Sequence, residues 1–333
     1  MTTTLIFLWF VVAAALVFDF TNGFHDSANA IATSISTRAL SPTTALAMAA
    51  VLNVAGGLLS VEVAKTLGNG IVDAAVVTPP VVLAALLGAI TWNIITWYFG
   101  LPSSSSHALI GGLAGAVIVA TTVGAVKWSG VLHKVIIPTV TSPFIGFAAG
   151  ALLLAILFWT FRRATPGPLN RRFRTIQTIS AGLMAFSHGS NDAQKTMGII
   201  ALALLAAGKI DHFHVPLWVK LASAGVIGLG TFAGGKRIIR TMGMKMVKLQ
   251  PIDGFAAETA ASGVLLATAS MGFPVSTTHV ITTAIMGVGA TKRFSAVRWG
   301  VTLNILVAWI LTLPAAALIG GGFCKLFEMV GIL

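Results

Sequence analysis

Two acidic motifs and two hydroxyl-rich motifs recur in the same order in the two halves of this sequence. The first motif places an aspartate among amide side chains, at Asp26 and again at Asp192, and the second follows Pro102 and Pro274 with serines and threonines that end in a histidine. Carboxylates with neighbouring amide oxygens bind hard cations or carry protons, whereas hydroxyls at a helix start donate to anions. The pattern indicates a protein that handles a cation and an anion together.

The acidic motifs predict a site for a coupling cation, either Na⁺ or H⁺. Asn-Gly at 22–23 and His-Gly at 188–189 favour helices that are interrupted near 19–29 and 188–192. A plain helix kink, with the aspartate paired to Lys195 or to a histidine, is the alternative. The cation ligands expected from the two motifs are Asn22, Asp26, Asn29, Asn191 and Asp192.

The hydroxyl motifs predict an anion cradle. Proline is tolerated in the first helical turn, and Ser or Thr caps unsatisfied N–H groups there. The segments that begin at Leu101 and Phe273 are either full crossings or re-entrant hairpins. Ordinary N-caps are the alternative role for these hydroxyls. No arginine stands in the apolar spans beside the anion-binding candidates Ser104, Ser105, Ser106, Ser276, Thr277 and Thr278.

Other polar residues near the motifs are candidates for supporting roles. Four histidines and two aspartates could ligate a transition metal, but we expect no dedicated metal site, since histidines also cap helices or steer an anion. Lys195 either neutralises Asp192 or attracts the anion. The supporting candidates are His25, His107, His188, Lys195, Glu258 and His279.

Composition places these motifs inside a membrane. Hydrophobic residues make up 56% of the 333 residues and charged residues 9%, against about 25% charged residues in soluble domains. The sequence therefore predicts an all-α integral membrane protein. Five apolar spans fall in each half, at 5–37, 42–66, 80–100, 103–124 and 131–160, and at 177–208, 216–235, 252–270, 275–290 and 297–322.

Basic residues predict the orientation, since Lys and Arg in short loops stay on the cytoplasmic side. The segment between the halves holds five arginines and no acid. With that segment in the cytoplasm, five spans per half put both termini outside the plasma membrane. An odd number of spans also inverts one half relative to the other. We expect one transmembrane domain of two inverted repeats, 1–160 and 177–333, joined by a cytoplasmic linker at 161–176.

The sequence also argues against other kinds of function. Its basic residues lie in short loops without interleaved aromatics, which is not the pattern of a nucleic-acid surface. No Gly-x-x-x-x-Gly-Lys-Ser/Thr pattern occurs, so no nucleotide can drive transport from within this chain. If the protein transports its ligands across the membrane, it must use an existing ion gradient, and we expect it to need no cofactor.

The motifs closely resemble the signatures of the inorganic phosphate transporter (PiT) family, most of all its bacterial low-affinity branch. This resemblance implies a symporter that imports inorganic phosphate with Na⁺ or H⁺ by alternating access, with its site between two inverted repeats. The likeness covers Asn22–Ala30, Trp97–His107, His188–Lys195, Pro274–Val280 and Trp309–Pro314, almost the whole length of the chain.

The resemblance also assigns roles to residues. It gives Asp26 and Asp192 to cation coupling and the hydroxyl runs with Gln194 to phosphate. Animal members carry an important glutamate where this chain has Asn53, and we place Glu258 at the matching position of the second half. The sequence leaves the coupling stoichiometry open. It also leaves open whether the protein forms a homodimer.

Alternatives to phosphate symport come from other cargo and from enzymes. Sulfate, a free divalent metal or a metal–phosphate complex could use the same fold. Sulfate carries no proton at neutral pH, so paired carboxylates suit phosphate better, whose OH can donate to one of them. An intramembrane enzyme acting on phosphate esters is disfavoured, because alternating access needs matched halves and catalytic roles are normally asymmetric. We therefore predict a transporter rather than an enzyme.

Overall fold

The computed structural model describes residues 2–73 and 77–333, and these residues fold as helices joined by short turns. An isolated bridge between Val72 and Val126 is the one β-type pairing among them. The predicted all-α fold is confirmed.

The first half contains two long helices with shorter ones between them. Its elements are α1 (Thr2–Ser36), α2 (Pro42–Gly57), α3 (Glu62–Gly70), α4 (Pro79–Phe99), α5 (Ser105–Ala120), η2 (Val123–Ala125), α6 (Trp128–Val131), η3 (Leu132–Ile136) and α7 (Ile137–Thr160). The last three elements form one segment, Trp128–Thr160.

The second half repeats this order of elements. It contains α8 (Pro166–Ala206), α9 (Leu217–Ala233), α10 (Lys236–Arg240), η4 (Thr241–Lys245), α11 (Pro251–Ser270), α12 (Thr277–Lys292), η5 (Phe294–Ala296) and α13 (Trp299–Met329). Since α8 already begins at Pro166, most of the predicted linker is helical, and only a short turn separates the halves.

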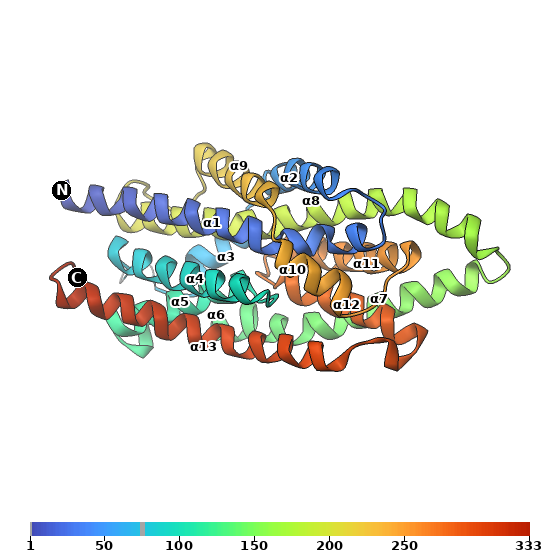
Figure 1. Ribbon diagram of the computed structural model, residues 1–333. Coiled ribbons are helices and arrows are strands. Elements are labelled where there is room, and N and C mark those ends of the chain that lie inside the picture. The colour runs from blue at the N-terminus through green and yellow to red at the C-terminus, as the bar shows by residue number, and fades with distance from the viewer. Residues whose placement is uncertain (1, 74–76) are drawn as a thin grey trace.

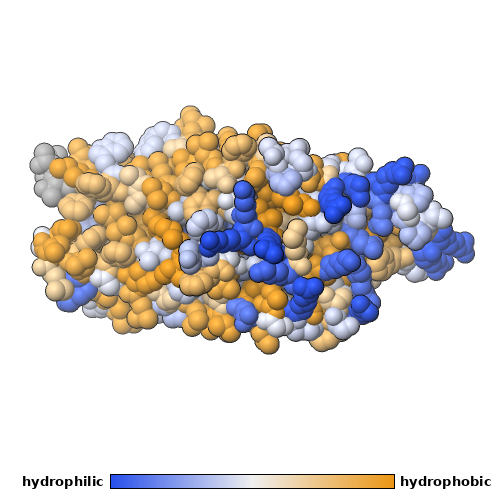
Figure 2. Space-filling model, in the orientation of Figure 1, coloured by the Kyte–Doolittle hydropathy of each residue, from blue (hydrophilic) through white to orange (hydrophobic). Residues whose placement is uncertain are grey.

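Membrane-crossing length is clear for only some of these helices. Four segments are long and apolar enough to cross a bilayer: Leu5–Ser36, Pro79–Phe99, Trp128–Thr160 and Trp299–Met329. Two bent pairs, α2 with α3 at 70° and α9 with α10 and η4 at 61°, raise the number to as many as six within the described residues. Figure 2 shows apolar side chains over much of the surface and hydrophilic ones gathered mainly toward one end.

Two helical pairs form hairpins. Helix α4 packs against α5, and α11 packs against α12. Figure 1 shows α4 and α5 toward the end with the chain termini, and α11 and α12 toward the opposite end. Helices α5 and α12 have 16 residues each, about 24 Å at 1.5 Å per residue, which is short of a bilayer core of about 30 Å. The structure supports the hairpin alternative for the segments that begin at Leu101 and Phe273.

Corresponding helices in the two halves make matching contacts. Helix α1 packs against α9 as α8 packs against α2, and α5 packs against α13 as α12 packs against α7. Figure 1 shows α1 and α8 running in opposite directions, with both termini at one end and the turn before Pro166 at the other. These features support the prediction of two inverted repeats, which stays a proposal.

Helices α1 and α8 are continuous through the acidic motifs, so the predicted interruptions near 19–29 and 188–192 are wrong. The two glycines serve helix packing instead. A Cβ on Gly23 would lie 2.5 Å from the Ile227 carbonyl oxygen, and one on Gly189 would lie 2.1 Å from the Asn53 carbonyl oxygen. Small residues at such contacts let membrane helices approach closely. The breaks fall between α2 and α3, between α9 and α10, and at the hairpin tips.

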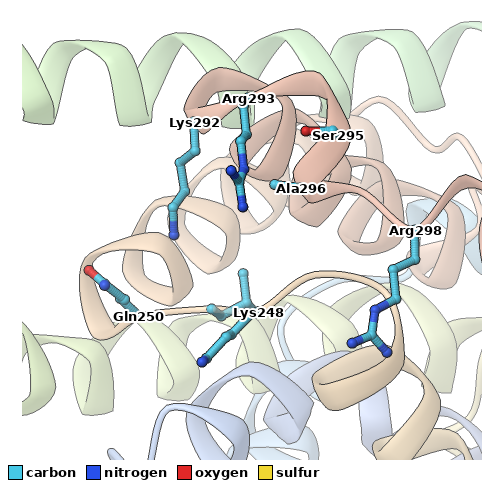
Figure 3. Close-up of a pocket in the computed structure, with 8 residues that line it drawn as sticks. Lys248, Gln250, Lys292, Arg293, Ser295, Ala296 and Arg298 are labelled. Carbon is cyan, nitrogen blue, oxygen red and sulfur yellow. The ribbon is translucent and has the colours of Figure 1, made fainter.

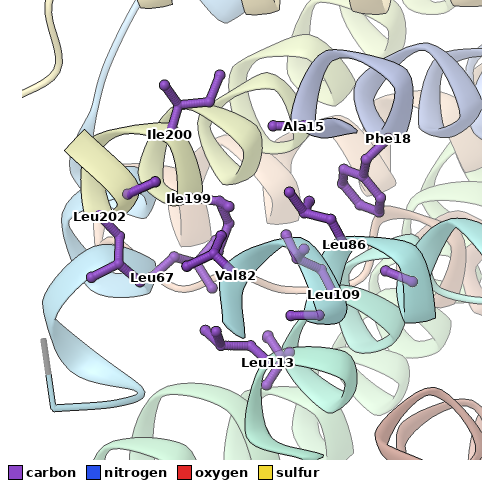
Figure 4. Packing of buried hydrophobic residues seen from close by; sticks show 14 of the residues in the cluster. Ala15, Phe18, Leu67, Val82, Leu86, Leu109, Leu113, Ile199, Ile200 and Leu202 are labelled. Atoms are coloured by element: carbon purple, nitrogen blue, oxygen red, sulfur yellow. The ribbon is translucent and has the colours of Figure 1, made fainter. Parts of the chain in front are cut away.

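Apolar cores surround the two hairpins. Around the first hairpin, Phe18 of α1 packs with Leu86 of α4, Leu109 of α5 and Ile199 of α8, as Figure 4 shows. A second cluster surrounds α11 and α12 and includes Leu265. The polar motifs therefore occupy the middle of the molecule, between two tightly packed apolar regions that fix the positions of the hairpin tips.

Candidate functional site

The central polar site joins four elements: α1, α8 and the first turns of α5 and α12. Asp26 on α1 and Asp192 on α8 are both buried. One carboxylate oxygen from each, together with a ring nitrogen of His188, lies within 4.8 Å of the others. The structure thus brings together the two aspartates that the sequence placed 166 residues apart.

Asp26 accepts hydrogen bonds from both hairpins. Its Oδ2 accepts from the Ser105 hydroxyl at 3.0 Å, and its Oδ1 accepts from the Thr278 hydroxyl at 3.2 Å. The same Oδ1 lies 2.8 Å from His25 Nδ1. The first carboxylate is held by neutral hydroxyls and one histidine.

Asp192 has an equivalent hydroxyl and an additional cation. Its Oδ2 accepts from the Thr277 hydroxyl at 3.3 Å and lies 3.2 Å from His188 Nε2. Its Oδ1 accepts a hydrogen bond from the ammonium group of Lys195, which is itself buried. Thr277 corresponds to Ser105 when the halves are aligned on Pro102 and Pro274, so each aspartate is bonded by the same position of its own hairpin.

The hairpin helices begin with capped N-termini. The Ser104 side chain accepts from the His107 backbone N–H at 3.2 Å, and Ser276 accepts from the His279 backbone N–H at the same distance. These two hydroxyls therefore act as N-caps, the alternative role for the hydroxyl runs. The hydroxyls that follow them are free to point into the site, where the helix N-termini add positive potential.

Contacts between the halves close the site. The Asn29 amide donates to the Thr277 and Thr278 hydroxyls at 3.2 and 3.0 Å. Lys195 donates to the Ser106 hydroxyl and to the Val275 carbonyl oxygen, the latter at 3.2 Å. Asn29 and Lys195 stand at the same position of the aligned motifs, so one polar side chain from each half reaches the hairpin of the other.

Gln194 lies outside this group of hydroxyls. Its Oε1 accepts from the Val63 backbone N–H at 2.9 Å, and its Nε2 donates to the Ser190 carbonyl oxygen. Helix α3 begins at Glu62, so Gln194 caps an orphan donor in the first turn of α3. The structure places it at the bend between α2 and α3 rather than against the anion-binding candidates.

The chain's family follows from comparison with known proteins. A family profile described as "Phosphate transporter family" matches residues 22–172 and 162–320. The chain belongs to this family. A probable low-affinity inorganic phosphate transporter of Rhizobium meliloti (strain 1021) is 53% identical over 311 residues, 93% of each chain. A protein of the same name from Bacillus subtilis (strain 168) is 45% identical over 93% of this chain and 94% of its own length.

A solved structure shares the fold of this phosphate transporter family member. It is described as the sodium-dependent phosphate transporter and superposes with a TM-score of 0.89 at 22% identity, over 98% of this chain and 100% of that one. The predicted family is confirmed. The chain is a multi-pass membrane protein whose relatives are named as transporters, not as enzymes.

The four motif histidines have different roles in the transporter. His25 Nε2 lies 3.1 Å from the Thr96 hydroxyl, so this ring joins Asp26 to α4. His188 Nδ1 lies 2.9 Å from the Asn53 Oδ1. His107 and His279 contact each other edge to face, at 4.9 Å between ring centroids, and neither bonds a central carboxylate. Two histidines orient the carboxylates, and two pack behind the hairpin tips.

Glu258 belongs to a separate buried cluster. It accepts from the Thr33 hydroxyl at 2.5 Å, from the Gln177 amide at 3.0 Å and from the Ser180 hydroxyl. It lies on α11, whereas Asn53 lies on α2, whose counterpart by order and bend is α9. The expected correspondence between Glu258 and Asn53 is therefore wrong, and Glu258 supports the packing of α1, α8 and α11.

Some buried polar groups near the site have no hydrogen-bond partner among the described residues. They include both amide atoms of Asn22 and Asn191 and both carboxylate oxygens of Asp19. Sequence reasoning missed Asp19. The sequence did contain a signal for this residue. Asp19 lies inside an apolar span, seven residues or two helical turns before Asp26, and therefore on the same helix face.

The central site offers ligands for both a cation and an anion. Asp26, Asp192 and His188 supply converging ligand atoms for a cation. The hydroxyls of Ser105, Thr277 and Thr278 could donate to an anion, but here they donate to the carboxylates. Lys195 adds one ammonium group, which bonds both Asp192 and the Ser106 hydroxyl.

Proposed function

We propose that this transporter is a secondary active importer of inorganic phosphate, driven by a Na⁺ or H⁺ gradient through alternating access. The names of its relatives support phosphate as the cargo. The solved protein of the same fold is described as sodium-dependent, which supports Na⁺ as a coupling ion. The residues of the central site supply groups that can bind both phosphate and the coupling ion.

One observation carries this proposal: the hydroxyls that suit phosphate are bonded to the carboxylates that suit a cation. Ser105 and Thr278 donate to Asp26, and Thr277 donates to Asp192. A cation or proton on a carboxylate weakens its hold on these hydroxyls. The hydroxyls then become available to phosphate oxygens, so cation binding favours phosphate binding at the same place.

Energetics require such coupling. Moving a negative charge into a cell against an inside-negative potential costs about 2.3 kcal/mol per charge per 100 mV. Phosphate carries one to two negative charges near neutral pH, so cations must accompany it. We assign the cation to Asp26 and Asp192 with Asn22, Asn29 and Asn191 nearby.

The proposed phosphate ligands are the hydroxyls of the hairpin tips with Lys195. Ser105, Ser106, Thr277 and Thr278 point toward the central side chains, whereas Ser104 and Ser276 hold the helix starts in place. Backbone N–H groups of the first turns add donors, since helix N-termini bind anions. Gln194 contributes indirectly by fixing α3.

The proposed transport cycle uses two inverted repeats, 1–160 and 177–333. Rocking of one repeat against the other would expose the central site first to one side and then to the other. In this proposal the chain lies in the plasma membrane with the 161–176 segment in the cytoplasm and both termini outside. A homodimer also remains a prediction.

Uptake into proteoliposomes tests this function. Labelled phosphate and labelled sulfate are supplied with an inward Na⁺ gradient or an inward H⁺ gradient imposed separately. We expect phosphate to accumulate under at least one gradient and sulfate not to compete at equal concentration. Accumulation of sulfate in place of phosphate, or equal phosphate entry without any gradient, would refute the proposal.

A metal–phosphate complex is a second candidate cargo. The convergence of Asp26, Asp192 and His188 within 4.8 Å is the observation that favours it, because carboxylates with one imidazole bind divalent transition metals. The same uptake assay with and without Mg²⁺ or Mn²⁺ separates the two cargoes. Free phosphate as cargo predicts uptake that persists after chelation of divalent ions.

A further inference from the structure

A cavity lined by basic side chains lies away from the central site, between the loop before α11 and the loop after α12. Its volume is about 550 Å³, and its lining includes Lys248, Lys292, Arg293 and Arg298. Figure 3 shows these four side chains around one open space, with Gln250 at its edge. None of them belongs to the acidic or hydroxyl motifs.

The charges of this cavity are largely uncompensated. Lys292 forms an ion pair with Asp253 at 2.7 Å, and Asp253 also accepts from the Gln250 backbone N–H at 2.8 Å. Within the described part of the chain, Lys248, Arg293 and Arg298 have no acidic partner. Three positive charges around one cavity give it a strong preference for an anion.

The loop that carries the two arginines is held in a fixed shape. The Phe294 and Trp299 rings stack with centroids 4.5 Å apart, and the Trp299 indole N–H donates to the Phe294 carbonyl oxygen at 3.1 Å. The Arg298 backbone N–H donates to the Met246 carbonyl oxygen at 3.0 Å. A preorganised pair of arginines loses less freedom when it binds a ligand.

The corresponding loops of the first half keep only one of these four basic residues, Lys127 at the position of Arg298. There the Lys127 backbone N–H donates to the Ile71 carbonyl oxygen at 2.9 Å, as Arg298 donates to Met246. Counting from these bonds, Asp73 stands where the second half has Lys248, and Thr121 stands where it has Lys292. The fold therefore does not require a basic cavity here.

We propose that this basic cavity binds a phosphate group, either of free orthophosphate or of an anionic phospholipid headgroup. Guanidinium groups match phosphate oxygens in pairs, and the volume accommodates a headgroup phosphate. If these loops face the cytoplasm, the excess of Lys and Arg in cytoplasmic loops explains basic residues anywhere in them. It does not explain their convergence on one cavity with a fixed loop. This proposal does not depend on the transport mechanism proposed above.

The test compares two double variants of the full chain with equal loss of charge. Arg293→Gln/Arg298→Gln removes the cavity arginines, and Arg240→Gln/Lys245→Gln removes two exposed basic residues that do not line the cavity. Both are made in a Ser105→Ala/Thr277→Ala background, which weakens phosphate binding at the central site. Equal thermal unfolding temperatures establish that both variants fold.

Two binding arms separate the sources of the phosphate group. The first measures equilibrium binding of labelled orthophosphate to protein in a neutral detergent. The second measures binding of short-chain phosphatidic acid, with phosphatidylcholine as control, by native mass spectrometry. We expect the cavity variant to bind at least one of these ligands roughly tenfold to a hundredfold more weakly than the control variant, as the loss of charged hydrogen bonds implies.

The outcomes assign the ligand or overturn the proposal. Loss in the orthophosphate arm alone identifies free phosphate, and loss in the phosphatidic acid arm alone identifies a lipid headgroup. Loss in both identifies a site for phosphate groups in general. Equal binding by the cavity variant and the control variant in both arms overturns the proposal, whatever the uptake assay shows.

Discussion

The two halves of the central site match in their hydroxyls and differ in their charge. Ser105 bonds Asp26 as Thr277 bonds Asp192. Beside Asp192 stands the ammonium group of Lys195, whereas the same position beside Asp26 holds the neutral amide of Asn29. One carboxylate thus has a permanent counter-ion within the chain, and the other does not. In the mechanism proposed above, both aspartates contact the coupling cation, and this comparison predicts that Asp26, which lacks a lysine partner, depends on that cation more than Asp192 does.

The largest effect expected from this comparison concerns the carboxylate without a counter-ion. Asp26→Asn keeps the size of the side chain and removes the charge that attracts the cation. We expect gradient-driven phosphate accumulation to be lost. The double variant Asp192→Asn/Lys195→Asn removes one proposed cation ligand and one proposed phosphate ligand but no net charge, so we expect it to retain part of the accumulation. Proteoliposome uptake measures both. Accumulation by Asp26→Asn at the level of the unchanged protein would show that the charge of Asp26 is not needed for coupling.

The next effect concerns stability of the paired half. Lys195→Asn gives the second half the asparagine that the first half has at the matching position, Asn29. The change leaves Asp192 buried without its cation. Removal of one partner of a buried ion pair destabilises a protein by about 3–5 kcal/mol. Thermal unfolding in detergent should show this loss, and the additional change Asp192→Asn should restore much of it. A single variant as stable as the unchanged protein would show that the pair is not needed.

The glycines of the two motifs give a matched test of helix packing. Gly23→Ala and Gly189→Ala would each place a methyl group against a backbone carbonyl of the opposite half. Overpacking of this kind typically destabilises by about 1–3 kcal/mol. We expect the larger loss at Gly189, where the approach is 2.1 Å against 2.5 Å at Gly23. The reverse order in unfolding temperatures would argue against this account of the unbroken helices.

The smallest effect concerns the hydroxyls, where the halves are most alike. Ser105→Ala and Thr277→Ala each remove one donor to phosphate, and a lost hydrogen bond of this kind weakens binding by about 1–2 kcal/mol, or roughly a factor of 5 to 30. Equilibrium phosphate binding to each purified variant measures the loss. Unchanged affinity in both variants would remove these hydroxyls from the proposed ligands.

The sequence alone predicted which residues form the candidate site better than it predicted how they are arranged. Long apolar spans indicated an all-helical membrane protein, and the repeated Pro-hydroxyl pattern marked the hairpin tips. Asp26 and Asp192 could be paired because the motifs recur in the same order. The unbroken course of α1 and α8 could not be predicted, since Gly23 and Gly189 pack against helices that are distant in sequence.

Other details depended on which way a side chain points. Gln194 follows Asp192 by two residues, and the helical turn directs it to the start of α3. Glu258 could not be assigned from the sequence, because its partners lie on α1 and α8. Asp19 was detectable as an acid in an apolar span, but only a continuous α1 puts it on the face of Asp26.

Phosphate affinity measured with and without the coupling cation tests the central claim most directly. Calorimetric titration of phosphate into purified protein is compared at zero and saturating Na⁺, and at two pH values, for the unchanged protein and Asp26→Asn. Coupling between sites typically amounts to about 1–3 kcal/mol, a factor of roughly 5 to 150. We predict that Na⁺ or acid strengthens phosphate binding by such a factor in the unchanged protein and has no effect in Asp26→Asn. The same enhancement in both proteins would contradict the claim that Asp26 links the cation to phosphate.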